Sequence, residues 1–410
     1  MVSDWKECTL GEVITLQRGF DLPIQDRKPG IVPIVSSSGI TGTHSDAKVL
    51  GPGVVTGRYG TIGQVFYVTR DFWPLNTTLY IKDFKGNDPL FISFLLKTID
   101  FEACSDKSSV PGVNRNHLHM IRVCLPSLSE QHAIAYILGT LDDKIELNRQ
   151  MNEMLESIAQ TLFKSWFVDF DPVRAKMEGR QPYGMDAETA ALFPDEFEDS
   201  QLGMIPKGWR VGTFKECCIR VENGGTPSRN EPVYWERGTI PWLTSGEVRQ
   251  GIVTSTKNLI SREGLVHSSA KIWPKGTTVV ALYGATAGQV CLLTEEMCAN
   301  QACCGLVPAS NARFYLYLRA SSSIKALEQQ ARGSAQQNLS QQIVADFPAL
   351  IANSVTLSRF DELVSPLFEK WIANLNESST LTAIRDALLP KLLSGQIRVK
   401  DAEKFVEAAI

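Results

Sequence analysis

The chain has 410 residues, of which 43% are hydrophobic and 21% are charged, a composition typical of a globular protein with two or three domains. It contains no run of 18 or more apolar residues, and its start, MVSDWKECTLGE, lacks the charged-then-apolar order of a signal peptide. We therefore expect a cytoplasmic chain without a membrane segment. The net charge of −4 excludes a protein that is basic overall, although it leaves room for local basic surfaces.

Residues 1–127 are predicted to form a compact α+β domain. Short β-branched and aromatic runs such as GVVTGRYG, GQVFYV and NTTLYIKDF are bounded by Gly, Pro and Asn, which is typical of strands and turns. Helical spacing follows Pro89 in LFISFLLKTIDFEAC. Asp88-Pro89-Leu90-Phe91 is close to a methyltransferase tetrapeptide, but no Gly-rich cofactor loop accompanies it. We interpret it as a turn and the start of a helix.

A long helix is predicted over residues 128–170, with Ser127 or Ser129 as its N-cap. From Ile134 to Trp166 apolar residues recur every three or four positions, which places them along one face. At ~1.5 Å per residue this stretch is about 50 Å long. A second helix, over residues 351–395, repeats the pattern 226 positions later (360 − 134 and 392 − 166).

The repeated spacing predicts an antiparallel helix pair, with two independent surface helices as the alternative. The residues expected to pair the helices are Ile134, Leu138, Leu141, Ile145, Asn148, Asn152, Leu155, Leu162, Phe360, Val364, Leu367, Trp371, Asn374, Leu381, Leu388 and Leu392. With centres aligned, Asn152 lies level with Asn374 and Asn148 level with Ser378. Because a buried amide is satisfied in one register only, these asparagines are predicted to fix the alignment. Arg385 and Pro390 interrupt the second pattern, so we expect its last turn to bend.

Residues 171–208 are rich in proline, glycine and acidic side chains and are predicted to be a linker. Residues 209–350 then repeat the first domain: PWLTS answers PIVSS, GTTVVALYGATAGQV answers GPGVVTGRYGTIGQV, and Asn300-Gln301 stands where Asn76-Thr77 stood. Residues 396–410 form a tail. The fold class is therefore α+β, with two repeated α/β domains separated by two long antiparallel helices that form a coiled-coil spacer.

No catalytic constellation is recognisable in the sequence, and there is no G-x-x-x-x-G-K-[ST] loop for ATP. His117-x-His119 has no acidic neighbour, so we interpret it as a surface turn rather than a metal ligand. Tyr59-Gly60-Thr61-Ile62-Gly63 is read as a strand–turn–strand corner rather than a phosphate loop. The nine cysteines include two adjacent pairs but no C-x-x-C, and we expect reduced, buried thiols and no metal site.

The loops between the repeated anchors are rich in the side chains that read base edges, since Arg pairs with guanine, Asn and Gln with adenine, and Ser and Thr with several bases. Solvated loops are the alternative interpretation of each residue, but the duplicated placement favours the set. In the first domain the predicted DNA-binding residues are Arg18, Ser37, Arg58, Tyr59, Asn76, Thr77, Lys107, Asn114, Arg115 and Asn116. In the second domain they are Thr226, Arg229, Thr244, Tyr283, Asn300, Gln301, Arg332, Ser334, Gln336 and Gln337.

The whole chain resembles the specificity subunit of type I restriction–modification systems. The resemblance is carried by LPSLSEQHAIAYILGTLDDKIELNRQMNEMLESIAQTLFKSWFVDFDPV, by the IPKGW that opens the second repeat, and by RYGTIG with its YGATAG echo. It implies two target-recognition domains, each reading one half of a bipartite, asymmetric double-stranded DNA sequence. It also implies that the paired helices set the spacing between the half-sites and dock two modification (methyltransferase) subunits.

The same resemblance implies that this chain is not itself an enzyme and holds no cofactor. S-adenosylmethionine would be bound by the modification subunits, and ATP and Mg²⁺ by restriction subunits that translocate and cleave DNA. The alternative is a scaffold that binds no DNA and holds two partner enzymes at a fixed spacing, a role for which the long helices alone would suffice.

Overall fold

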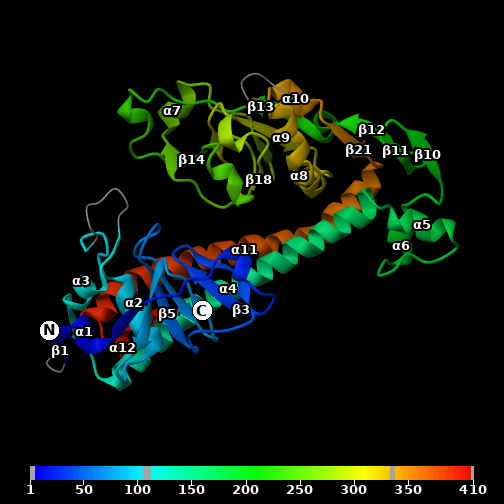
Figure 1. The fold of residues 1–410 in the computed structure, drawn as a ribbon. Helices are drawn as coiled ribbons and strands as arrows, with labels where there is room; N and C mark the ends of the chain where they lie inside the picture. The colour runs from blue at the N-terminus through cyan, green and yellow to red at the C-terminus, as the bar shows by residue number, and fades with distance from the viewer. Residues whose placement is uncertain (1–4, 105–111, 333–337, 408–410) are drawn as a thin grey trace. The chain divides into compact units, whose positions relative to one another are not determined.

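The computed structural model describes residues 5–104, 112–332 and 338–407, and it divides into two compact units (Figure 1). Unit 1 comprises Met1–Leu147 and Glu377–Ile410, and unit 2 comprises Asn148–Asn376. Each unit contains one α/β domain and one half of each long helix, so neither long helix belongs to a single unit.

The domain of unit 1 contains three small sheets. Strand β1 (Lys6–Thr9) pairs with β9 (Arg122–Leu125), which brings the two ends of the domain together. A four-stranded sheet has the order β2 (Thr15–Arg18), β8 (Thr78–Asp83), β5 (Gly53–Gly57), β6 (Val65–Val68). A three-stranded sheet has the order β4 (Gly39–His44), β3 (Val32–Ser36), β7 (Trp73–Pro74), with β3 parallel to β7. The helical segments are α1 (Leu10–Val13), η1 (Ile24–Asp26), α2 (Pro89–Lys97) and α3 (Arg115–His119).

The domain of unit 2 repeats the strand order of the first domain, with one strand more in its larger sheet. Its ends are joined by β12 (Arg210–Thr213) and β21 (Pro348–Ile351). The larger sheet has the order β13 (Cys218–Asn223), β20 (Cys303–Pro308), β17 (Thr278–Ala281), β18 (Val290–Leu293), β15 (Ile252–Val253). The smaller sheet has the order β16 (Asn258–Ile260), β14 (Ile240–Leu243), β19 (Cys298–Ala299). Its helical segments are η2 (Phe214–Cys217), η3 (Pro232–Tyr234), η4 (Glu247–Gln250), α7 (Arg262–Val266), η5 (Gly284–Thr286), α8 (Arg313–Ser322), α9 (Ile324–Arg332) and α10 (Gln341–Ala345).

Backbone hydrogen bonds define which positions of the two domains are equivalent. The amide of Gly19 donates to Thr78 O as that of Gly224 donates to Cys303 O. The amide of Leu75 donates to Val35 O as that of Asn300 donates to Leu243 O. Asn76 is therefore equivalent to Gln301, one residue later than the sequence alignment placed it.

The long helices are α4 (Leu128–Phe167) and α11 (Ser354–Leu393), each of 40 residues. Both bounds of α11 follow those of α4 by 226 positions (354 − 128 and 393 − 167). Ser127 caps α4, because its Oγ accepts from the amide of Glu130 at 3.4 Å. Helix α11 continues through Pro390 to Leu393.

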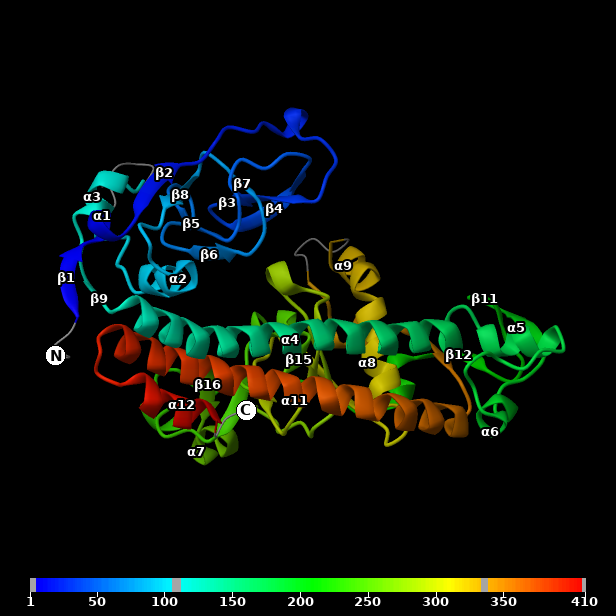
Figure 2. The ribbon, with the colours of Figure 1, turned by 90° about the horizontal axis from the view of Figure 1, so that it is seen from below.

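In each unit one half of α4 lies antiparallel beside one half of α11, and both halves belong to the core of that unit's domain (Figure 2). In unit 1, Leu138, Leu141 and Leu388 are buried together with Phe91 and Phe94 of α2. The polar interruption at Arg385 is an inter-helix contact, because its Nη1 donates to Asp142 Oδ1 at 2.6 Å. Burial of this apolar surface is the main force that holds the helices to the domain.

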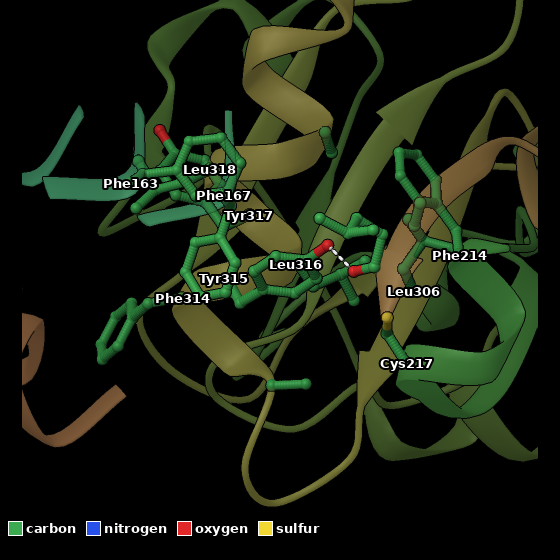
Figure 3. Close-up of a cluster of buried hydrophobic side chains, with 14 of the residues drawn as sticks. Phe163, Phe167, Phe214, Cys217, Leu306, Phe314, Tyr315, Leu316, Tyr317 and Leu318 are labelled. Atoms are coloured by element: carbon green, nitrogen blue, oxygen red, sulfur yellow. Dashed lines mark hydrogen bonds between the residues drawn. The ribbon is translucent and has the colours of Figure 1, made fainter. Parts of the chain in front are cut away.

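In unit 2 the corresponding core is strongly aromatic (Figure 3). The rings of Phe163 and Phe167 on α4 lie 5.9 and 4.8 Å from that of Tyr315 on α8. Phe167 also lies 5.0 Å from Phe360 of α11, edge to face. The buried Tyr315 hydroxyl donates to the carbonyl oxygen of Leu350 in β21. This contact joins α8 to the strand that leads into α11.

The predicted pairing residues lie on the facing sides of the two helices. Ile134, Leu138, Leu141, Phe360, Val364, Leu381, Leu388 and Leu392 are buried, and Ile145, Leu162, Leu367 and Trp371 pack against the cores from half-buried positions. Leu155 is half-buried. At the centre, Nδ2 of Asn374 donates to Oδ1 of Asn152 at 2.9 Å, and Nδ2 of Asn148 approaches the carbonyl oxygen of Asn374 at 3.5 Å. The predicted Asn152–Asn374 pair is thus present.

The segment 171–208, predicted to be an irregular linker, is folded. It contains α5 (Asp171–Met177), α6 (Ala187–Ala191) and a hairpin of β10 (Phe197–Ser200) and β11 (Gly203–Pro206). Phe193 lies edge to face with Trp166 at 4.9 Å and is 2% exposed. The sequence does not reveal these elements, because elements this short show no sustained periodicity, although their few aromatic side chains join the core.

The tail contains a further helix, α12 (Val399–Glu407), whose Ala402 is buried in the core of unit 1. Among the described helices, none combines the length and the apolar character needed to cross a membrane.

Replacing both Asn152 and Asn374 by Leu is expected to leave the free energy of unfolding unchanged or to raise it by about 1–4 kcal/mol, because a buried polar pair becomes an apolar contact. Asn374→Leu alone leaves the Asn152 amide buried without its partner and should cost about 1–3 kcal/mol. Denaturant unfolding measures both, with the exposed Ser157→Leu as control. Spin labels at positions 153 and 370 should show a broader distance distribution in the double variant. Lower stability of the double variant than of wild type would contradict this account.

Phe193→Ala should lower the free energy of unfolding by about 3–5 kcal/mol, because it empties a buried aromatic site. Tyr183 lies in the same segment, but its side chain is fully exposed. Tyr183→Ala is therefore expected to change the free energy of unfolding by no more than about 0.5 kcal/mol. Equal effects of the two substitutions in denaturant unfolding would show that the segment does not contribute to the core.

Candidate nucleic-acid interface

Five of the predicted binding residues of the first domain line one hollow, which we call the arginine hollow. Arg18, Arg58, Tyr59, Asn114 and Arg115 form its polar walls, and Leu79, Gly112 and Val113 complete it, around a volume of 330 Å³. These residues come from the end of β2, the corner after β5 and the start of α3, which are far apart in sequence.

Backbone contacts hold the hollow together. The amide of Arg58 donates to Thr77 O at 2.9 Å, and its carbonyl accepts from Val113 N at 3.0 Å. Tyr59 and Gly112 form an isolated antiparallel bridge. A side chain at Gly112 would meet the ring of Tyr59, since an added Cβ would lie 2.3 Å from Tyr59 Cε1. The predicted strand–turn–strand corner is confirmed, with Gly60 and Gly63 at φ +79° and +78°.

The charge of the hollow is positive and largely uncompensated. Among the described residues that line it none is acidic, and the one carboxylate near a lining arginine is Asp21, whose Oδ1 lies 3.9 Å from Arg18 Nη2. The Arg58 guanidinium lies over the ring of Tyr59, 4.5 Å from its centroid. Asn114 caps α3 by accepting from the amide of Asn116 at 3.0 Å. The arrangement therefore offers many hydrogen-bond donors and few acceptors.

The remaining predicted residues of the first domain surround the hollow or lie elsewhere. Ser37 lies beside the same corner, with its Oγ 3.3 Å from the position of a Cβ on Gly60. Asn76 is bonded to Asp21. Thr77 contributes its backbone carbonyl rather than its side chain. Asn116 is exposed on α3. Lys107 lies outside the described residues.

In the second domain, the predicted residues that the structure describes form separate local contacts. The Thr226 hydroxyl donates a hydrogen bond to Gln301. These two positions are equivalent to Asp21 and Asn76, which are also hydrogen-bonded, so both domains have a side-chain pair here but with different residues. Asn300 Oδ1 accepts from the amide of Ala302 at 3.1 Å, and Thr244 Oγ1 donates to Glu247 at 2.7 Å. These side chains stabilise turns, which sequence reasoning could not separate from readers of bases.

Two arginines and a tyrosine of the second domain remain exposed. The Arg229 guanidinium lies over the ring of Trp235 at 3.5 Å and near that of Trp242 at 5.0 Å. Trp235 was not among the predicted binding residues. Its closeness to Arg229 in the sequence was the signal that could have indicated this contact. Tyr283 forms an isolated bridge with Asn338 and is 40% exposed. Arg332 ends α9, 3.9 Å from Glu328. Ser334, Gln336 and Gln337 lie outside the described residues.

Comparison with known proteins identifies the family to which the two repeated domains belong. The family model described as "Type I restriction modification DNA specificity domain" matches residues 2–157 and again residues 206–349. The chain belongs to the type I restriction–modification DNA specificity family. The two matches cover the two repeated domains and most of α4.

Relatives within this family extend along the whole chain. The chain is 28% identical to the type I restriction enzyme HindI specificity subunit of Haemophilus influenzae, over 97% of this chain and 100% of the relative. It is 27% identical to the MjaIX specificity subunit of Methanocaldococcus jannaschii, over 78% of this chain and 71% of the relative. The crystal structure of a type I restriction–modification S subunit from M. genitalium has the same fold, with a TM-score of 0.67, 16% identity, and coverage of 95% and 96% of the two chains.

Neither histidines nor cysteines form a metal site in the part of the chain that the structure describes. His119 lies on α3 rather than in a turn, and its Nε2 accepts from the amide of Leu16 at 3.0 Å. Burial lowers the pKa of this imidazole, which favours the neutral acceptor. All nine cysteines are free thiols. Burial raises the pKa of Cys217 to about 11 and those of Cys298 and Cys304 to about 12.

Alkylation of the folded chain near neutral pH should modify the exposed Cys124 and spare the buried Cys291, Cys303 and Cys304, because the reactive thiolate is both inaccessible and disfavoured. Mass spectrometry after a short iodoacetamide pulse measures this. In denaturant all nine cysteines should react, which provides the control. Fast modification of Cys303 or Cys304 in the folded chain would contradict the buried-thiol interpretation.

Proposed function

We propose that each of the two domains reads one half of a bipartite, asymmetric DNA sequence. The observation that carries the proposal is one backbone frame present twice with different side chains at equivalent corners. Equivalent backbone hydrogen bonds, made by Gly19 and Gly224 and by Arg58 and Leu282, align the two domains. In this alignment the first domain has Arg18, Arg58 and Arg115 where the second has Asn223, Leu282 and Gln341. Since side chains at base edges determine sequence preference, two different surfaces are expected to select two different half-sites.

The long helices are proposed to set the spacing of the half-sites and to dock two modification (methyltransferase) subunits. Large apolar side chains remain exposed along them: Tyr136 is 74%, Leu147 50% and Met154 65% exposed on α4, and Val355 59% and Leu363 44% exposed on α11. A partner subunit docked on the helices would cover these side chains. Restriction subunits would join the same complex.

The chain is proposed to be a non-catalytic subunit in the cytoplasm. The modification subunits would bind S-adenosylmethionine, and the restriction subunits ATP and Mg²⁺. Support comes from the sequence, which lacks a P-loop and a Gly-rich methyltransferase loop. The net charge of −4 suggests that the partners supply much of the contact with DNA phosphates. A scaffold that binds no DNA is the competing function, and the exposed apolar side chains of the helices would serve it equally.

Arginine substitutions distinguish the two functions. Arg58→Ala or Arg115→Ala should weaken or relax methylation at one half-site only, and Arg332→Ala at the other, because each domain contacts its own half. Genome-wide mapping of methylated adenines, in cells with and without the gene and with each variant, measures this. Arg180→Ala, an exposed arginine outside both domains, is the control. Unchanged methylation and DNA binding by the assembled complex in all three variants would favour the scaffold.

A further inference from the structure

The arginine hollow has a composition that restricts what it can bind. Three arginines supply up to fifteen N–H donors, since each guanidinium has about five and no acceptor. Neither Arg58 nor Arg115 forms an ion pair within the part of the chain that the structure describes. A ligand of this hollow is therefore expected to present mainly acceptors.

The hollow also has apolar surface. Leu79 and Val113 line it but are almost fully buried, so its accessible apolar surface is the ring of Tyr59, which is 37% exposed. This ring can pack against the edge of a base, whereas a phosphate gains nothing from it. Arg58 is held against Tyr59 at 4.5 Å, which restricts the plane of its guanidinium. A guanidinium fixed in this way loses less conformational entropy when it forms two parallel hydrogen bonds.

We infer that the arginine hollow reads the major-groove edge of a guanine in the half-site of the first domain; this rests on the proposed function. In the major groove guanine presents two acceptors, N7 and O6, whereas adenine and cytosine present an amino donor and thymine presents a methyl group beside its single acceptor. Walls in which donors predominate match guanine among the four bases. Arg58 and Arg115 make the contact, and Arg18 lies at the rim, drawn towards Asp21.

The second domain strengthens the assignment by contrast. Its equivalent corner keeps the bridge between Tyr283 and Asn338, and Leu339 N donates to Leu282 O at 2.8 Å as Val113 N does to Arg58 O. Leu282 is buried, and Nε2 of Gln341 donates to Val221 O at 2.8 Å. The same frame thus carries no guanidinium at these positions, so guanine reading by this corner belongs to the first domain alone.

The test uses the complete complex with its modification subunits. Genome-wide methylation by wild type first defines the motif, and failure to direct methylation to a bipartite motif would refute the proposed function itself. Arg58→Leu and Arg115→Gln, which install the residues of the second domain, should then relax one G·C position in one half-site and leave the other half unchanged. Arg70→Ala removes an exposed charge outside the hollow and should leave the motif intact.

Binding of defined duplexes identifies the contact. Placing 7-deazaguanine at the relaxed position removes the N7 acceptor and should weaken wild-type binding about 10- to 100-fold. The Arg58→Leu complex should lose nothing further on that duplex. The inference is overturned if the variants lose affinity equally for all sequences with a shallower salt dependence, which indicates a phosphate contact. It is equally overturned if both variants keep the wild-type motif.

Discussion

The antiparallel contact between α4 and α11 is the constraint on which the rest of the structure depends. Each unit obtains part of its core from both helices, so the two domains cannot be complete unless the helices meet in one alignment. Apolar pairs at helical spacing would tolerate a shift by one turn, because similar side chains would meet again. The amide contact between Asn152 and Asn374 would be lost by such a shift, since it forms in one register only.

The duplicated domains show how one frame can carry two specificities. Equivalent backbone hydrogen bonds hold equivalent corners in both copies, while the side chains at those corners differ in charge and shape. Asp21 with Asn76 and Thr226 with Gln301 occupy the same places. Because the frame is maintained by main-chain contacts and buried strands, substitutions at the corners change the surface without changing the fold. Function is thus located in the sites that the frame presents.

Several polar side chains that resemble readers of bases by type proved to support turns. Thr244 bonds to Glu247, Asn300 to the amide of Ala302, and Asn114 caps α3. Asn, Ser and Thr serve turns and bases with the same atoms, so residue type alone does not separate the two roles. The predicted arginines differ, since Arg18, Arg115, Arg229 and Arg332 are exposed and Arg58 is half-buried beside Tyr59.

The sequence by itself determined the repeat, the lengths and common register of the long helices, the central asparagine pair and the strand–turn–strand corners. Each of these features follows from a local periodicity or from the fixed offset between the repeats. Both can be identified in the sequence without knowing which distant residues are in contact. Only the tertiary structure decided that residues 171–208 are folded and that Arg385 pairs with Asp142. It alone also brought Arg18, Arg58 and Arg115 to one hollow. Those features depend on contacts between residues that lie far apart in the sequence. A local sequence pattern does not indicate which distant residue a side chain will contact.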